Sequence, residues 1–429
     1  MKKTICIVLA VVIGLLGSGC ASSKKTEGEN EQVVLHIGLP SGDKLTPWAI
    51  VEGFQKEKPN ITLEIDETPW VEYMRKLKLQ LAGGTPPGLF LMDSGFVMSM
   101  GMNGALLDLS DRVKKDIKAD DYSAALFAGK DPDGKLWGIP HALNSAAVFY
   151  NKKMFDDAGI PYPTDDWTYD EMFEIAKKLT VKDPNSDGRN DKYGLGLNGN
   201  ITIGWLPFVT ATGGAPLDET RTKSMFTDPK TIEGMKKLVD ASTDDTMCAP
   251  TDWVNAMGGH QTGLYKNQLA MIINQTSLIG NLNRGGEVDF DVAPIPIGWD
   301  GKRHVTYVPN FLSISKAVPE SEQNAAWEFL EYYLSDEPQR LTAEQMLAGI
   351  PIKKTALEYL ANRKDTSPAN IKAFYEYLDD CGVTLYENKT WTEWEPKVTE
   401  TVREMCGKRM SFDEGMAKIE KDVSLVLGN

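Results

Sequence analysis

The sequence predicts an α/β fold divided between two domains. The chain has 429 residues, which is more than one hydrophobic core usually serves. Strand and helix patterns alternate over residues 33–93, and this order is typical of a parallel sheet with ligand loops at the carboxyl ends of its strands. The apolar stretch Gly134–Phe155 has the pattern of extended chain, and we interpret it as a passage from one domain to the other.

The N-terminus has the pattern of a secretion signal. Two lysines precede an apolar run from Ile5 to Leu16, which is too short to span a membrane comfortably, and small residues lead on to Cys20. The segment resembles the bacterial lipoprotein signal, which predicts removal of residues 1–19, lipid attachment at Cys20 and a location at the outer face of the cell membrane. An ordinary cleaved secretory signal is the alternative. Residues 20–32 are polar and predict a flexible tether.

The charge balance excludes some partners. The chain carries 46 Lys and Arg against 61 Asp and Glu, a formal net charge of −15, and loss of the two signal lysines would make the charge more negative. Such a surface repels nucleic acid and anionic lipid, so we expect no nucleic-acid partner and membrane contact through the lipid anchor only. We expect a monomer. Outside the signal, the spacing of Cys248, Cys381 and Cys406 matches no metal motif; at most one disulfide can form, and buried free thiols are expected.

The first domain is predicted from alternating start and stop signals. Thr46-Pro47 and Thr68-Pro69 each combine a capping residue with a proline at the first helical position. The predicted elements are a strand at Val33–Ile37, a helix from Thr46, a strand at Ile61–Asp66, a helix from Thr68 to Gly83, and a strand at Leu89–Met92 that ends at Asp93.

The rest of the chain continues the mixed pattern. Capping boxes at Thr168/Glu171 and Ser411/Glu414 predict two helix starts. The other predicted elements are a helix start at Asn151, a strand at Tyr193–Leu197, a helix from Asp228 to Ala241, strands at Ala270–Ile273 and Phe290–Ala293, an extended passage at Leu312–Ser315, a helix at Ala325–Leu334 and a helical end from Thr355 to Asn429.

Two segments imitate ligand motifs. Gly129–Lys135 has the spacing of a phosphate-binding loop, but Leu136 replaces the Ser or Thr that would meet magnesium, so we interpret it as a turn. The second segment matches the first nine positions of an EF-hand loop, with oxygen ligands at Asp183, Asn185, Asp187 and Asp191. Gly194 stands where the bidentate Glu is needed, so a weak calcium site and an acidic turn both remain open, and no cofactor is required.

No constellation of catalytic residues is evident. The four histidines, His36, His141, His260 and His304, are far apart in the sequence, and there is no G-x-S-x-G motif. We therefore expect a protein that is not an enzyme.

The tryptophans are more informative. Trp205 follows a predicted strand, and Trp391 and Trp394 open a late helix among polar residues. A solvent-facing indole can stack on the C–H face of a sugar ring while neighbouring polar groups bind its hydroxyls. Ordinary packing in a core or lid is the alternative for each of them.

The order of signals resembles the family 1 extracellular solute-binding proteins of ABC importers, the group that includes maltose-binding protein. The segments that carry the resemblance are AGGTPP, LFLMD, DGKLWGIP, VFYNKKMFDDAGI, PTDDWTYDEMFEIAKKLT with the DPNSDGRNDKYG loop, TATGG, LAMII, FDVAPIP, WEFLEYYLSDEPQ and GIPIKK. They are spread over most of the mature chain in the family's order.

The resemblance implies a type II periplasmic-binding-protein fold, with two α/β lobes, a ligand cleft between them and a hinge of crossing strands. It divides the chain into an N-terminal lobe of residues 33–143 plus 312–353 and a C-terminal lobe of residues 144–311 plus 354–429. The ligand positions that it implies are Asp43, Asp93, Asn144, Trp205 and Trp391 or Trp394. The family's PPD is Pro86-Pro87-Gly88 here, and Gln275-Thr276-Ser277 lacks a customary stacking tryptophan.

The function that follows is a lipid-anchored binding protein that captures a carbohydrate, with an oligosaccharide expected, and delivers it to a permease with its ATPase. Alternatives are a binding protein for a non-sugar solute such as a polyamine or peptide-like cation, a secreted glycan-active enzyme, and a sensor module.

Overall fold

One mixed sheet runs through the computed structural model, which describes residues 32–41, 48–182, 190–285, 288–345, 349–364 and 367–428. Its strands lie in the order β2-β1-β3-β9-β4-β7-β6-β5, while β10 pairs with β9 and β8 pairs with β4. The strands are β1 (Val33–Ser41), β2 (Ile61–Pro69), β3 (Leu89–Asp93), β4 (Ile139–Asn151), β5 (Val181–Lys182), β6 (Asn190–Gly196), β7 (Leu269–Gln275), β8 (Phe290–Ala293), β9 (Val305–Ile314) and β10 (Gly382–Val383). The predicted α/β class is confirmed.

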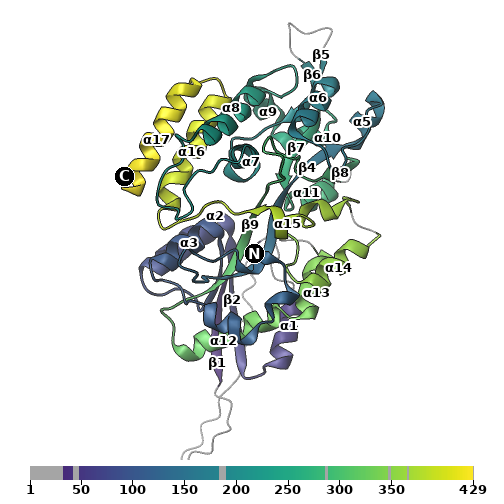
Figure 1. Ribbon diagram of the computed structural model, residues 1–429. Coiled ribbons are helices and arrows are strands. Elements are labelled where there is room, and N and C mark those ends of the chain that lie inside the picture. Colours follow the sequence, from purple (N-terminus) through teal and green to yellow (C-terminus); the bar gives the residue numbers. More distant parts are fainter. Residues whose placement is uncertain are drawn as a thin grey trace, which may run out of the picture.

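The first lobe, the lower one in Figure 1, contains the predicted β-α-β-α-β order, and β1 pairs in parallel with both β2 and β3. Its helices are α1 (Trp48–Glu57), α2 (Trp70–Ala82), α3 (Ser94–Met102), α4 (Ser110–Asp116), α12 (Glu320–Tyr333) and α13 (Asp336–Gln345), with 3₁₀ turns at η1 (Ala119–Asp121) and η2 (Ala124–Phe127). The predicted helix start at Thr68 is wrong. Thr68 and Pro69 extend β2 because they continue its parallel pairing with β1, and α2 begins at Trp70.

The remaining helices lie mostly in the second lobe, but α14 packs against α13 of the first lobe and α15 packs against η2 (Figure 1). They are α5 (Lys152–Ala158), α6 (Tyr169–Leu179), a π-helical turn η3 (Ile201–Trp205), α7 (Leu206–Ala211), α8 (Pro229–Thr243), α9 (Thr251–Met257), α10 (His260–Tyr265), α11 (Leu278–Gly285), α14 (Lys354–Asn362), a 3₁₀ turn η4 (Ile371–Phe374), α15 (Leu378–Cys381), α16 (Trp391–Cys406) and α17 (Phe412–Leu427). Both capping boxes and the Asn151 cap form as predicted. The helical end is only partly confirmed, because short turns and β10 occupy much of the stretch between α14 and α16.

Strand β4 joins the two lobes. It pairs with β9 over Ile139–Ser145 and with β7 over Ala146–Tyr150, so its two halves belong to two different parts of the sheet. All 13 of its residues are buried, because each face is covered by a core. The predicted passage within Gly134–Phe155 is therefore a crossing strand, and β9 is the second one. The residue numbers at which one domain gives way to the other stay a prediction.

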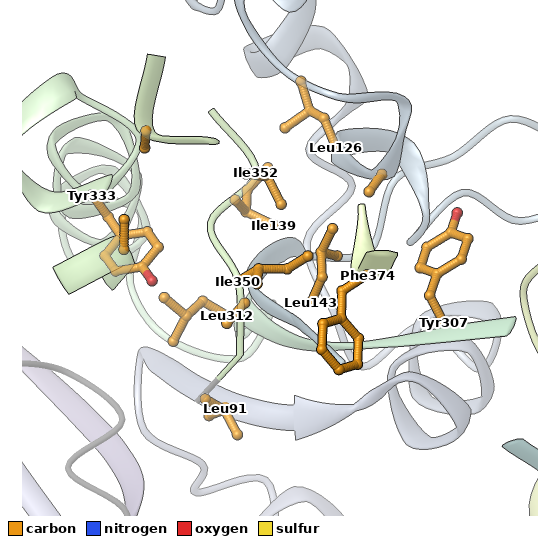
Figure 2. Packing of buried hydrophobic residues seen from close by; sticks show 14 of the residues in the cluster. Leu91, Leu126, Ile139, Leu143, Tyr307, Leu312, Tyr333, Ile350, Ile352 and Phe374 are labelled. Atoms are coloured by element: carbon orange, nitrogen blue, oxygen red, sulfur yellow. The ribbon is translucent and has the colours of Figure 1, made fainter. Parts of the chain in front are cut away.

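A third passage of chain crosses beside β4. The backbones of Leu143 and Ile350 exchange two hydrogen bonds, at 2.9 and 3.0 Å. Gly349, just before, has a φ of +136°, and a Cβ there would overlap the carbonyl group of Leu143. Figure 2 shows Leu143 and Ile350 packed together with Leu312 and Phe374. The junction between the lobes is thus packed with apolar side chains that are continuous with the core of the first lobe.

Thr276 stands where the family usually has G-x-W, and it ties β7 to the same junction. Its hydroxyl accepts a hydrogen bond from the Ser145 N–H at 3.1 Å, and its own N–H donates to the Ser145 carbonyl at 3.2 Å. A buried threonine therefore holds the junction at this position.

The phosphate-loop look-alike is a turn, as predicted. Lys135 N–H and Gly134 N–H both bond back to Asp131, and a bridge between Lys130 and Leu136 closes the turn. The chain continues as extended backbone, whereas a phosphate loop needs a helix here. Separately, none of the described helices is both long and apolar enough to cross a membrane.

Candidate functional site

The first half of the candidate site is the start of α3, where Asp93 ends strand β3. The Asp93 carboxylate caps the helix by accepting a hydrogen bond from Phe96 N–H at 3.0 Å. Burial raises the pKa of Asp93; the helix cap and Lys78 oppose this rise, and Glu387 adds to it. The end of strand β3 thus places the partly desolvated carboxylate of Asp93 at the edge of the first lobe.

The second half is α16, which belongs to the other lobe. Glu395 on this helix is 8% exposed, and its Oε1 accepts a hydrogen bond from the Thr399 hydroxyl at 2.5 Å. The Thr399 hydroxyl accepts in turn from Trp205 Nε1 at 3.1 Å. Burial raises the pKa of Glu395, Thr399 and Arg403 lower it, and Asp93 raises it further. Two carboxylates from different lobes therefore lie close enough to affect each other.

The two halves touch through α3 and α16 (Figure 1). The Trp391 indole lies directly against Gly95, and Ser99 Oγ donates a hydrogen bond to the Lys389 carbonyl at 3.0 Å. Trp391 is half-buried, and its Nε1 is buried without a hydrogen-bond partner among the described residues. Trp391 is thus the indole that lies at the boundary between the lobes.

Trp205 and Trp394 are fully buried in the core of the second lobe. Trp394 Nε1 donates to Asn388 Oδ1 at 3.0 Å, and Trp205 packs on Phe226. The segment around Trp205 is the π-helical turn η3, which leads into α7. Core packing, the alternative to a solvent-facing ring, is therefore what both indoles show in this conformation, and their role in ligand binding stays a prediction.

Asn144 lies on the crossing strand β4 and Tyr307 on the crossing strand β9, on opposite faces of the sheet. Asn144 is 9% exposed and pairs in register with Val308 of β9. Burial raises the pKa of Tyr307 to about 12, and the nearby Glu387 adds to the rise. Arg221 donates from Nη1 to the Glu387 carbonyl at 2.8 Å.

Sequence reasoning missed four residues of this region: Arg221, Tyr307, Glu387 and Glu395. For Glu395 a signal existed, because it follows Trp391 by four residues and so shares a helix face with it. For the others the chain offers no local signal, since segments far apart in sequence bring them together.

Several predicted site residues lie outside the described residues: Asp43, Cys20, and Asp183, Asn185 and Asp187 of the acidic loop. Asp191 is described and lies exposed in β6. Within the described ranges, no three His, Cys, Asp or Glu side chains gather in a way that could hold a metal ion. Cys248 and Cys406 are buried free thiols, and Cys381 is a half-buried one.

The chain is similar to known binding proteins over most of its length. A protein of Brucella abortus that is named only as a binding protein is 23% identical over 364 residues, which is 84% of each chain. The polygalacturonan/rhamnogalacturonan-binding protein YtcQ of Bacillus subtilis is 24% identical over 297 residues, 63% of this chain and 58% of that one.

Solved structures show the same fold at low identity. An ABC substrate-binding protein of Listeria monocytogenes, solved in complex with cycloalternan, superposes with a TM-score of 0.78 at 20% identity, covering 93% of this chain and all of that one. The sugar-binding protein MalE of Xanthomonas citri gives a TM-score of 0.77 at 16% identity, covering 92% and 97%.

The family itself follows from a match that spans residues 49–373, to the family described as bacterial extracellular solute-binding protein. This range contains both crossing strands and the start of α3. The two-lobed fold, the crossing strands and this match together show that the chain belongs to the bacterial extracellular solute-binding proteins.

Proposed function

We propose that this protein is the solute-capturing subunit of an ABC importer, and that it binds a carbohydrate, an oligosaccharide in our proposal, between its lobes without changing it chemically. One observation carries the proposal. Asp93 of the first lobe and Glu395 and Trp391 of the second meet at the contact between α3 and α16. A solute held there touches both lobes only when they come together.

The chemistry of these groups suits a sugar. Carboxylates accept hydrogen bonds from hydroxyl groups, each contributing about 1.5–3 kcal/mol because the acceptor is charged. An indole at the edge of the same region offers an apolar face to the C–H side of a ring. A solute that makes these contacts only in the closed form shifts the equilibrium between open and closed protein towards the closed form.

The names of relatives support a carbohydrate. Besides the polygalacturonan/rhamnogalacturonan-binding protein, they include a galactooligosaccharide-binding protein and a maltodextrin-binding protein, both of Bacillus subtilis, at 24% and 25% identity. The Listeria protein with the same fold was solved with cycloalternan. These ligands share many hydroxyl groups and pyranose faces.

Anchoring and delivery belong to the same proposal. Lipid attachment at Cys20 would hold the protein at the outer face of the membrane, and residues 20–32 would form a flexible tether between the lipid and the folded lobes. The permease would recognise the closed pair of lobes and pass the solute inward with its ATPase. Labelling with a radioactive fatty acid, lost in Cys20→Ser, tests the anchor.

A cationic solute is the second candidate, because Asp93, Glu387 and Glu395 bring three carboxylates to one region. Lys78, Arg221 and Arg403 offset part of this charge. A polyamine or a basic peptide would complement the negative charge that these three cations leave uncompensated.

One panel separates these candidates. Purified protein is screened by thermal shift against oligosaccharides, monosaccharides, polyamines and basic peptides, and each hit is measured by calorimetry and checked for reaction products. We expect a rise in melting temperature with an oligosaccharide and no product. Stabilisation by cations alone would replace the sugar proposal, and product formation would contradict a pure binding role.

A further inference from the structure

The contact between α3 and α16 depends on a glycine. Gly95 is the second residue of α3, and a Cβ placed on it would lie 2.8 Å from Cδ2 of Trp391 and closer still to Cε3 and Cζ3. Real Cβ atoms essentially never come this near. All three of the nearest atoms belong to the same indole, so the side chain missing at position 95 makes room for the other lobe alone.

We propose that Gly95 is the residue that lets the lobes close, because only a bare α-carbon allows the Trp391 ring to seat on α3. This inference rests on the proposed function, in which closure captures the solute. A methyl group at position 95 would meet the ring before the two helices reached their contact distance. Trp391 is partly buried, so its ring cannot move aside without losing packing.

A second contact lies one helical turn further along α3. Ser99 follows Gly95 by four residues and therefore shares its helix face. Its hydroxyl donates to the carbonyl of Lys389, two residues before Trp391. The same face of α3 thus makes a steric contact and a hydrogen bond with the segment that opens α16, and both require the same approach of the lobes.

The empty closed form carries a penalty at this contact. Trp391 Nε1 is buried in this conformation and has no acceptor in the described part of the chain. A buried donor without a partner opposes the state that buries it. A solute that brought an acceptor oxygen to this N–H would relieve the penalty, so the same indole would couple closure to the presence of solute.

A disulfide trap across the contact tests the proposal without any solute. Ser99→Cys and Lys389→Cys are combined with Cys381→Ser, and the rate of disulfide formation with the thiol oxidant diamide is followed by non-reducing gel electrophoresis. The rate reports how often the lobes close, even when the closed form is a minor state. The trap is compared in three backgrounds: Gly95, Gly95→Ala, and Gly95→Ala with Trp391→Ala.

We expect the link to form with Gly95, to slow by about tenfold or more with Gly95→Ala, and to recover to within about threefold when Trp391→Ala is added. Alanine is the best helix former, so Gly95→Ala should leave α3 folded, and an unchanged melting temperature checks this. Three results would overturn the proposal: no link with Gly95, an equal rate with Gly95→Ala, or no recovery with Trp391→Ala.

The disulfide trap and the solute panel test separate claims, so one can fail without the other. A panel without hits would remove the proposed carbohydrate function and leave the trap rates as they are. A trap that behaves against expectation would remove the role of Gly95 and leave solute binding intact.

Discussion

Asn144 is the residue of the first crossing strand that we expect to touch the solute, since it lies buried at the junction and pairs in register with β9. Asn144→Ala should weaken solute binding by about 1 kcal/mol, roughly fivefold in affinity, because one hydrogen bond is lost. Calorimetry with the best solute of the panel measures the change. Asn255→Ala on the exposed surface of α9 is the control. Equal affinities for the wild type and Asn144→Ala would remove Asn144 from the site.

Glu395 should make the stability of the protein depend on pH. Its pKa is raised in the folded state above the ordinary value of 4.5, chiefly by burial. The folded state therefore binds a proton more tightly than the unfolded state does. The stabilisation from this proton is fully present below pH 4.5 and is lost as the pH rises through the folded-state pKa.

Glu395→Gln should remove this dependence and stabilise the protein at neutral pH, because the amide oxygen still accepts from Thr399 while no charge is buried. Urea unfolding at a series of pH values above 4.5 measures the difference. Glu404→Gln on the same helix, whose carboxylate is exposed and whose pKa is lowered by Arg409, is the control and should not stabilise at neutral pH. A parallel pH profile for wild type and Glu395→Gln would contradict the assignment.

Among individual residues, the sequence could point to Asp93 and Trp391, because Asp93 ends a predicted strand and Trp391 opens a predicted helix. For Glu395 it offered only the four-residue spacing from Trp391, and it gave no local signal that selects Glu387 among 61 acidic residues. Their significance arises from burial and from the approach of the other lobe, and neither leaves a local pattern. Trp394 shows the reverse case, since its polar neighbours in sequence did not keep its ring exposed.

At the scale of elements, the junction of β4 with β7 depends on Thr276. Thr276→Val should lower the free energy of unfolding by about 1–3 kcal/mol, because the buried N–H of Ser145 loses its hydrogen bond to the threonine hydroxyl while the shape is kept. Urea unfolding measures this cost. Thr62→Val, at an exposed threonine of β2, is the control and should change stability by less than about 0.5 kcal/mol. A Thr276→Val variant as stable as the wild type would show that the hydroxyl is dispensable.

Elements with strong local signals were predicted well. Two capping boxes and the Asn151 cap fix the starts of α17, α6 and α5 within the chain itself. The start of α2 was misplaced because the Thr-Pro signal fits an extended strand equally well, and the parallel partner of β2 decided between them. The double role of β4 follows from its partners on either side, which no local pattern records.

At the scale of the whole molecule, the empty protein should be more open in solution than the structure with its lobes in contact. The indole N–H of Trp391 has no hydrogen-bond partner among the residues that the structure describes, and the carboxylates of Asp93 and Glu395 raise each other's energy, so both disfavour the empty closed form. Small-angle scattering should therefore give a larger radius of gyration without solute than with it. Identical scattering curves at saturating solute would contradict closure as the binding step.

The two-domain architecture was within reach of the sequence, because chain length and alternating elements both favour it. The arrangement of the lobes was not, since three passages of chain cross at one junction and the last helices return to the second lobe. Those pairings join residues hundreds of positions apart. They are decided by packing that periodicity does not encode.

The return of α16 to the second lobe has a consequence for how the chain acquires its structure. Trp394, Val398 and Val402 of this helix fill the same core as Val148 of β4, so that core stays incomplete until nearly the whole chain has been synthesised. The first lobe has β1, β2 and β3 within its first hundred residues, and that part of its sheet can form early. Contacts of such long sequence separation are slow to form, because a long loop must be closed first. Since the N-terminal part of the chain can fold first, the second lobe will expose apolar surface for longest, and it is the part that most needs protection from aggregation.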